Sequence, residues 1–119
     1  YLQACNDTTM LIPQCETIGC LENIEEITAI PGVDGIFIGP YDLSIAMEIP
    51  GQFTNPAFQQ ALDRVKKACK AAGKPLFIYA GSTAASNEYF AQGIEGVALG
   101  TDLAVYIDGF RNIMKEIKR

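Results

Sequence analysis

Apolar and polar residues alternate along the chain in a way that predicts short buried strands. Residues 9–16 (TMLIPQCE), 35–39 (GIFIG), 75–81 (PLFIYAG) and 96–100 (GVALG) are apolar runs flanked by turn residues. Runs of this length and composition are typical of strands that are buried on both faces. Pro13 lacks a backbone donor, which weakens the assignment of the first run as a strand.

Between and after these runs, the apolar residues recur at helical spacing. Residues 19–30, 83–93 and a short stretch at 43–48 are predicted helices, and the opening YLQACNDTT resembles the tail of another. The clearest pattern covers residues 55–73, where Asn55 can cap the helix, Pro56 starts it and Gly73 ends it. Its apolar stripe consists of Phe58, Leu62, Val65 and Cys69.

A final helix is predicted from about Asp102. Its apolar side consists of Leu103, Ile107, Phe110, Met114 and Ile117. We expect this side to pack on the chain's own sheet, with exchange between two copies of the chain as the alternative.

The resulting pattern is α/β, with four consecutive βα units and no linker, so residues 1–119 form one partial domain. Such alternation predicts a parallel sheet with right-handed crossovers. Two architectures fit it: a small open doubly wound sheet, or half of a (β/α)8 TIM barrel, which takes about 250 residues when complete. The GxGxxG fingerprint of dinucleotide folds follows none of the strands, which weakens the nucleotide-binding form of the open sheet.

Composition narrows the classes of partner. The formal charge of −5 argues against nucleic acid and anionic membranes, both of which need a basic surface. The four cysteines show no metal-finger spacing, and there is no histidine to complete a zinc site. With no signal peptide or membrane-spanning run in the sequence, we expect reduced cysteines and a cytoplasmic protein. Because the first residue is Tyr1 and not Met, we also expect a fragment.

Polar residues mark the ends of the first two strands. Gln14 and Glu16 are two residues apart and therefore face the same side, while Asp42 follows the next strand. The carboxyl ends of neighbouring parallel strands meet at one edge, where α/β proteins build their sites. Two converging carboxylates repel each other unless a cation lies between them or one of them holds a proton. Oxygen ligands without histidine or thiolate favour a hard divalent cation, Mg²⁺, Mn²⁺ or a similar ion. The alternatives are that Asp42 only caps a helix beginning at Leu43 and that Glu16 is a solvated loop residue.

Several segments resemble the HpcH/HpaI aldolase/citrate lyase family, specifically its metal-dependent pyruvate aldolases. They are PQCET, LENIEEI, PGVDGIFIGPYDLS and VALGTDLA, and the resemblance covers essentially the whole chain as the C-terminal half of a barrel. It implies that Glu16 and Asp42 bind a divalent ion (Mg²⁺ or Mn²⁺, with Co²⁺ as a further option). It also implies that Gln14 contacts substrate and that the backbone N–H groups of Tyr41 and Asp42 receive the carboxylate of pyruvate.

The chemistry that the resemblance implies is cleavage of a 4-hydroxy-2-oxo acid to pyruvate and an aldehyde. No lysine is placed for the imine alternative, since Lys66, Lys67 and Lys70 are on a helix and Lys74 precedes its strand. The family's histidine base and its arginine come from the N-terminal half, so we expect little activity from this chain alone.

If the chain is half of a barrel, it needs a partner to complete the barrel. We expect pairing with an N-terminal half-barrel or a second copy, as a homo-oligomer, and the family is one in which helices are exchanged between subunits. The alternative functions are a CoA-ester lyase of the citrate lyase type and a non-catalytic half-barrel that serves oligomerisation.

Overall fold

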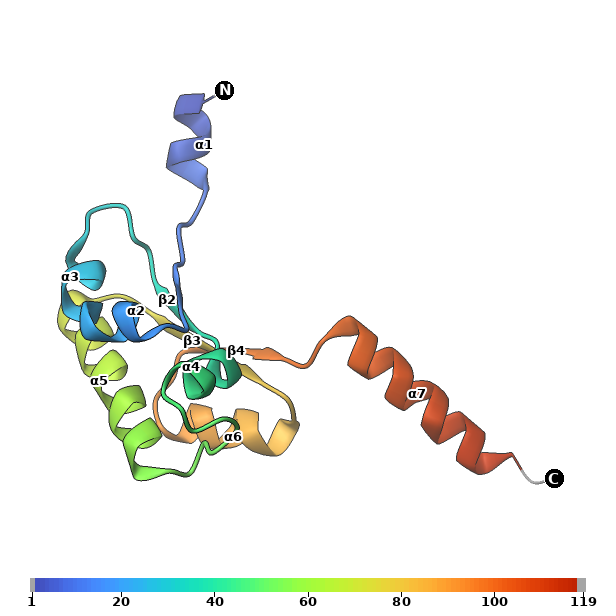
Figure 1. Cartoon of the computed structure of the whole chain (residues 1–119). Coiled ribbons are helices and arrows are strands. Elements are labelled where there is room, and N and C mark those ends of the chain that lie inside the picture. The colour runs from blue at the N-terminus through green and yellow to red at the C-terminus, as the bar shows by residue number, and fades with distance from the viewer. Residues whose placement is uncertain (1, 118–119) are drawn as a thin grey trace.

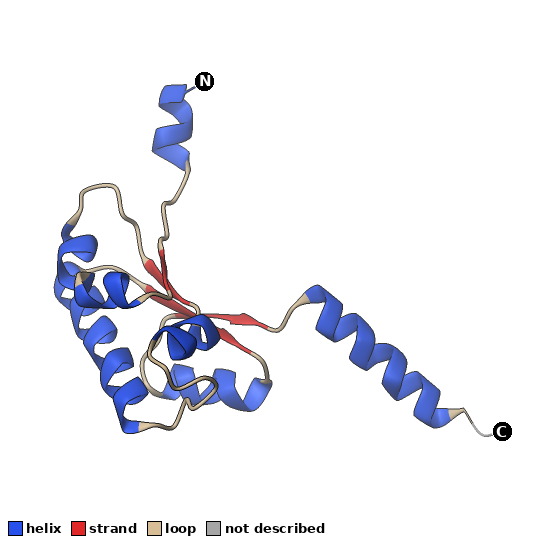
Figure 2. Cartoon of the chain, in the orientation of Figure 1, coloured by secondary structure: helices blue, strands red, loops and turns tan. Residues whose placement is uncertain are grey.

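The computed structural model describes residues 2–117. Tyr1, Lys118 and Arg119 lie outside the described residues, so the helix-tail interpretation is tested only from Leu2 onward. Four parallel strands pair in the order of the sequence: β1 (Gln14–Cys15), β2 (Ile36–Ile38), β3 (Leu76–Ala80) and β4 (Gly96–Leu99). Figure 2 shows them side by side at the centre of the molecule. The prediction of repeated βα units with a parallel sheet is therefore confirmed.

Seven helices lie within the described residues: α1 (Leu2–Thr8), α2 (Ile18–Glu22), α3 (Ile24–Ala29), α4 (Pro40–Ala46), α5 (Pro56–Ala72), α6 (Thr83–Ala91) and α7 (Asp102–Glu116). The longest, α5, has the predicted ends. The Asn55 side chain accepts a hydrogen bond from the N–H of Ala57, and Gly73 ends the helix in the left-handed conformation at φ 66°.

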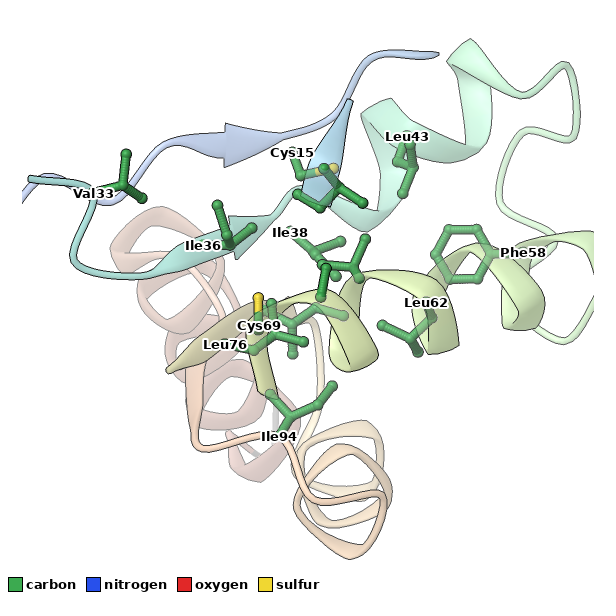
Figure 3. Packing of buried hydrophobic residues seen from close by; sticks show 14 residues of the cluster. Cys15, Val33, Ile36, Ile38, Leu43, Phe58, Leu62, Cys69, Leu76 and Ile94 are labelled. Carbon is green, nitrogen blue, oxygen red and sulfur yellow. The ribbon is translucent and has the colours of Figure 1, made fainter. Parts of the chain in front are cut away.

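The core lies between one face of the sheet and the helices α3 and α5. Alternate strand residues Ile36, Ile38, Leu76 and Ile78 point into it, together with the apolar stripe of α5. Figure 3 shows Phe58 and Leu62 of this stripe near Ile38 and Leu43. The Arg64 guanidinium joins α5 to α3 through Glu25, at 2.9 and 2.8 Å, and these hydrogen bonds lower the pKa of the Glu25 carboxyl to about 2.

No helix of the described part of the chain forms a layer over the opposite face of the sheet. Its residues Phe37, Phe77 and Tyr79 are only half-buried. The ring of Phe77 lies against two glycines, Gly35 directly before β2 and Gly96 in β4. A Cβ on Gly35 would lie 3.1 Å from its Cε2, and one on Gly96 would collide with the ring. A sheet covered on one face, with two free edges, is the geometry of a barrel half.

Three predicted elements differ from the structure. The strand over 9–16 shrinks to Gln14–Cys15, because residues 11–13 meet β2 only through isolated bonds such as Phe37 N–H to Pro13 C=O, 2.9 Å. The helix over 19–30 is split at Asn23, whose side-chain amide donates to the Gly19 carbonyl at 2.8 Å and competes with helical bonding. The short helix predicted at 43–48 begins at Pro40 and ends at Ala46.

The expectation that the last helix packs on its own sheet is wrong. Figure 1 shows α7 extending away from the rest of the molecule, and no residue of α7 is buried. Leu103, Tyr106 and Phe110 are 64%, 65% and 52% exposed. The predicted apolar stripe is present, but nothing within residues 2–117 covers it.

Candidate active site at the carboxyl ends of β1 and β2

The register between β1 and β2 determines which side chains meet at the end of the sheet. Gln14 pairs with Phe37, and Cys15 pairs with Ile38, so Glu16 lies beside Gly39. Cys15 is buried in the core, where desolvation raises the pKa of its thiol. Its two neighbours Gln14 and Glu16 therefore point to the other face of the sheet, as predicted from the two-residue period.

On that face the two side chains contact each other. The Gln14 Nε2 group donates a hydrogen bond to Glu16 Oε2 at 2.6 Å. This bond orients both side chains, since the amide is held as a donor and its carbonyl oxygen is left to accept from elsewhere. Glu16 directly follows β1 and is half-buried.

Gly39 provides the space in which this pair lies. A Cβ on Gly39 would lie 2.8 Å from Gln14 Nε2 and 2.9 Å from Glu16 Oε2, so a side chain here would force the ends of both side chains to move. Its φ of −88° is open to every residue, so the glycine leaves space for this pair and does not serve backbone conformation. Sequence reasoning missed this role, although a glycine directly before a proline at a strand end was the available signal.

Asp42 belongs to the first turn of α4, which begins immediately after Gly39. Gly39 is the N-cap and Pro40 the first helical residue, so the alternative that Asp42 caps a helix starting at Leu43 is wrong. A helical turn rises only about 5 Å, which keeps Asp42 within one turn of the glycine that Glu16 approaches. Asp42 is exposed and takes part in none of the ion pairs found within residues 2–117.

The backbone at this turn has unpaired donors. Pro40 has no N–H group. The N–H groups of Tyr41 and Asp42 are in the first turn of the helix, where no helical carbonyl lies four residues earlier to accept their hydrogen bonds. The Leu43 N–H is the first to bond back, to the Gly39 carbonyl at 2.9 Å. These two free amides belong to the turn that directly follows Gly39 and contains Asp42.

Other charged groups lie away from this edge. Lys74 donates to the carbonyls of Ile30 and Val33 at the amino ends of β2 and β3. A cavity of about 520 Å³ is also at the amino ends, near Leu76 and Glu95, and contains none of the predicted site residues. Arg111 pairs with Asp108 on α7 at 3.2 Å.

Within residues 2–117, no group of three histidine, cysteine or acidic side chains is arranged to hold a metal ion.

Residues 2–117 include no helix long and apolar enough to cross a membrane.

Ser82, Thr83 and Ser86 lie at the start of α6. Ser82 caps its first turn, and the Ser86 hydroxyl donates to the Ser82 carbonyl at 3.0 Å. Thr101 caps α7 by accepting from the Ala104 N–H at 3.2 Å. Ser82, Ser86 and Thr101 therefore have structural roles that account for them.

The fold and this edge define half of an eightfold βα barrel with an acidic, amide-lined rim. Residues 3–109 match the family described as HpcH/HpaI aldolase/citrate lyase, and the chain belongs to that family. It is 35% identical over 118 residues to 2-dehydro-3,6-dideoxy-6-sulfogluconate aldolase of Pseudomonas putida, covering 99% of this chain and 46% of the relative. It is 34% identical over 113 residues to hydroxypyruvate/pyruvate aldolase of Cupriavidus necator, covering 95% and 42%.

A solved structure gives the same result. The crystal structure of an HpcH/HpaI aldolase/citrate lyase family protein from Burkholderia cenocepacia J2315 superposes with a TM-score of 0.90 at 34% identity, covering 98% of this chain and 45% of that one. The chain spans about half the length of the relatives it matches. The resemblance inferred from the sequence motifs is therefore confirmed, and so is the half-barrel.

We predict that Gly39→Ala displaces the Gln14–Glu16 pair. The added methyl group occupies the place of both side chains, so the hydrogen bond between them breaks. In ¹H–¹⁵N spectra the Gln14 side-chain amide signals should move to the positions of a free glutamine. The matched control is Gly19→Ala, where nothing lies within 4 Å of the new Cβ. Unchanged Gln14 signals in folded Gly39→Ala protein would contradict the packing described here.

Proposed function

We propose that this chain is the metal- and pyruvate-binding half of an aldolase that cleaves 4-hydroxy-2-oxo acids to pyruvate and an aldehyde. The observation that carries the proposal is the arrangement around Gly39, where the bonded Gln14 and Glu16 side chains meet the turn that presents Asp42. Relatives that match nearly the full chain and are named aldolases support it. The activity is a property of the whole barrel, of which this chain supplies part.

The residues at this edge fit a hard divalent ion. Glu16 and Asp42 supply carboxylate oxygens and no nitrogen or sulfur, the donor set that suits Mg²⁺ or Mn²⁺, with Co²⁺ as a further option. Mg²⁺ is commonly held by one or two carboxylates, with water and substrate completing its shell, so a third acidic ligand is not required. When bound, the ion supplies Lewis-acid stabilisation of the negative charge that develops on the substrate oxygen.

The neighbouring groups would orient the substrate. The N–H groups of Tyr41 and Asp42 are free donors at a helix start, and they would bind the carboxylate of pyruvate. Gln14 donates to Glu16, so its carbonyl oxygen remains able to accept a hydrogen bond from a substrate hydroxyl. Glu16 is thereby held in one orientation by a residue that also contacts substrate.

The proton-transfer group would come from the other half of the barrel. This chain has no histidine, Arg64 is bound to Glu25, and Arg111 is bound to Asp108. Neither of these arginines is at the acidic rim. Without a general base, the chain can bind and orient a substrate but cannot complete the cleavage.

The test is a retro-aldol assay with added Mn²⁺ or Mg²⁺. We expect no turnover by the isolated chain and measurable turnover after mixing with the amino-terminal half of the Pseudomonas putida relative. The difference should be about 10²–10⁴-fold, the usual contribution of a general base. Glu16→Gln chain mixed with the same half is the control and should stay inactive. Normal turnover by the isolated chain, or by the Glu16→Gln mixture, would refute the proposal.

A non-catalytic role in oligomerisation is the second candidate, and the exposure of α7 favours it. The helix presents Leu103, Ile107 and Phe110 to solvent, and contiguous apolar surface of this kind marks an interface. We propose that α7 packs on a second copy of the chain, which would return the same contact by symmetry. This contact is compatible with the aldolase function and does not depend on it.

We predict that Phe110→Glu disrupts this association, because it places a charge in the centre of the apolar side of α7. Light scattering should show a dissociation constant raised by roughly tenfold or more, as for a central interface residue. Asn112→Glu puts the same charge on the polar side of the helix and should leave the association unchanged. Equal effects of the two substitutions, or a monomeric parent chain, would contradict the interface.

A further inference from the structure

An apolar pocket opens beside the acidic rim. It has a volume of about 290 Å³ and lies between the start of α4, the carboxyl end of β3 and the helix α6. Phe53, Tyr79 and Tyr89 contribute aromatic rings, and Ala85 forms part of its wall on α6. Figure 1 shows α4 and α6 close together on this side of the molecule. The proposed chemistry at Glu16 and Asp42 does not use this pocket.

The pocket and the rim share one segment of backbone. Pro40 and Tyr41 line the pocket, and they directly follow Gly39. The side chains of Gln14 and Glu16 approach the backbone of Gly39. Tyr41 also carries one of the two free amides at the start of α4. A substrate with its carboxylate at these amides would therefore have the pocket within reach of its other end.

The chemistry of the walls restricts what can enter. No charged side chain lines the pocket. Tyrosine hydroxyls are neutral near pH 7, and burial raises the pKa of the Tyr89 hydroxyl further. A carboxylate, sulfonate or phosphate group would lose its hydration there without gaining a cationic partner, which is strongly unfavourable. An apolar group gains from the same burial.

The volume sets the size of the occupant. An apolar cavity of about 150 Å³ is enough for benzene, so this pocket accepts one ring or a branched alkyl group with space to spare. It is at the lower end of the range for small-molecule sites, roughly 300–1,000 Å³, as expected when it receives only part of a substrate.

We propose that this pocket binds the apolar substituent of the aldehyde partner and selects aromatic or branched aliphatic aldehydes over charged ones. The proposal rests on the aldolase function, and it adds the substrate class. Tyr41 is then a specificity-determining residue through its side chain and an anion-binding residue through its backbone.

The test uses the 119-residue chain with benzyl alcohol, which resembles benzaldehyde but does not react with lysine. Titration followed by NMR should shift the ring signals of Tyr41, Tyr79 and Tyr89. Ala85→Leu fills the pocket and should weaken binding by roughly tenfold, because the probe then loses most of its buried contact. Ala84→Leu adds the same side chain at the exposed neighbouring position and should leave the affinity unchanged.

Several results would overturn the inference. They are an absence of shifts at these tyrosines, equal effects of Ala85→Leu and Ala84→Leu, or shifts of the Tyr79 and Tyr89 ring signals by glycolate, a charged hydroxy acid. Shifts of Tyr41 by glycolate are expected from its backbone amide and do not bear on the pocket. Tyrosine signals that move with protein concentration and not with benzyl alcohol would show that a second copy fills the pocket. If Ala85→Leu protein does not fold, the pattern of shifts in the parent chain decides alone.

A second measurement separates this inference from the function it rests on. Mn²⁺ binding, followed by water proton relaxation, should be the same in Ala85→Leu and in the parent chain, because the pocket is distinct from Glu16 and Asp42. Failure of the parent chain to bind Mn²⁺, with benzyl alcohol binding intact, would count against the aldolase function and not against the pocket. Loss of benzyl alcohol binding with Mn²⁺ binding intact would do the reverse.

Discussion

The hydrogen bond between Gln14 and Glu16, made in the space above Gly39, is the contact on which the candidate site depends. It exists because β1 and β2 are parallel and in the register that pairs Cys15 with Ile38. A shift of one residue would turn Cys15 to the solvent and Glu16 into the core. Because Cys15 is buried in the apolar core, the neighbouring Glu16 must point to the opposite face of the sheet. Packing and site geometry are set by the same register.

Helices cover only one face of the sheet, and this feature of the fold supports the proposed role as half of a barrel. Helices α3 and α5 bury one face, while Phe37, Phe77 and Tyr79 on the other are left half-buried. In a complete barrel that second face points toward the axis and packs against the remaining strands. The rim holding Glu16 and Asp42 would then open onto the end of a closed barrel. In the proposed aldolase, the other half of the barrel would supply both the facing part of the core and the proton-transfer group.

Much of this was predictable from local signals. Asn55 and Gly73 predicted the two ends of the helix α5, and short apolar runs predicted three of the strands. The pairing of Gln14 with Glu16 followed from the strand period. The break at Asn23 depends on a side-chain bond to Gly19, and no periodicity reveals that. The exposure of α7 could not be predicted, because an amphipathic stripe shows that a helix needs a partner and not where the partner is. The spatial role of Gly39 and the pocket at Tyr41 both depend on side chains brought together by pairing over long sequence distances.

The central claim is that Glu16 and Asp42 hold one divalent ion beside Gly39. The most direct test is paramagnetic line broadening by Mn²⁺ in ¹H–¹⁵N spectra of the chain. Broadening should be confined at low Mn²⁺ to the amides of residues 39–43 and the Gln14 side chain. Glu16→Gln and Asp42→Asn should each weaken it by roughly tenfold or more, as expected for loss of a direct ligand. Glu26→Gln, at an exposed position of α3, should not. Broadening spread over the acidic surface, or unchanged in Glu16→Gln protein, would contradict the account.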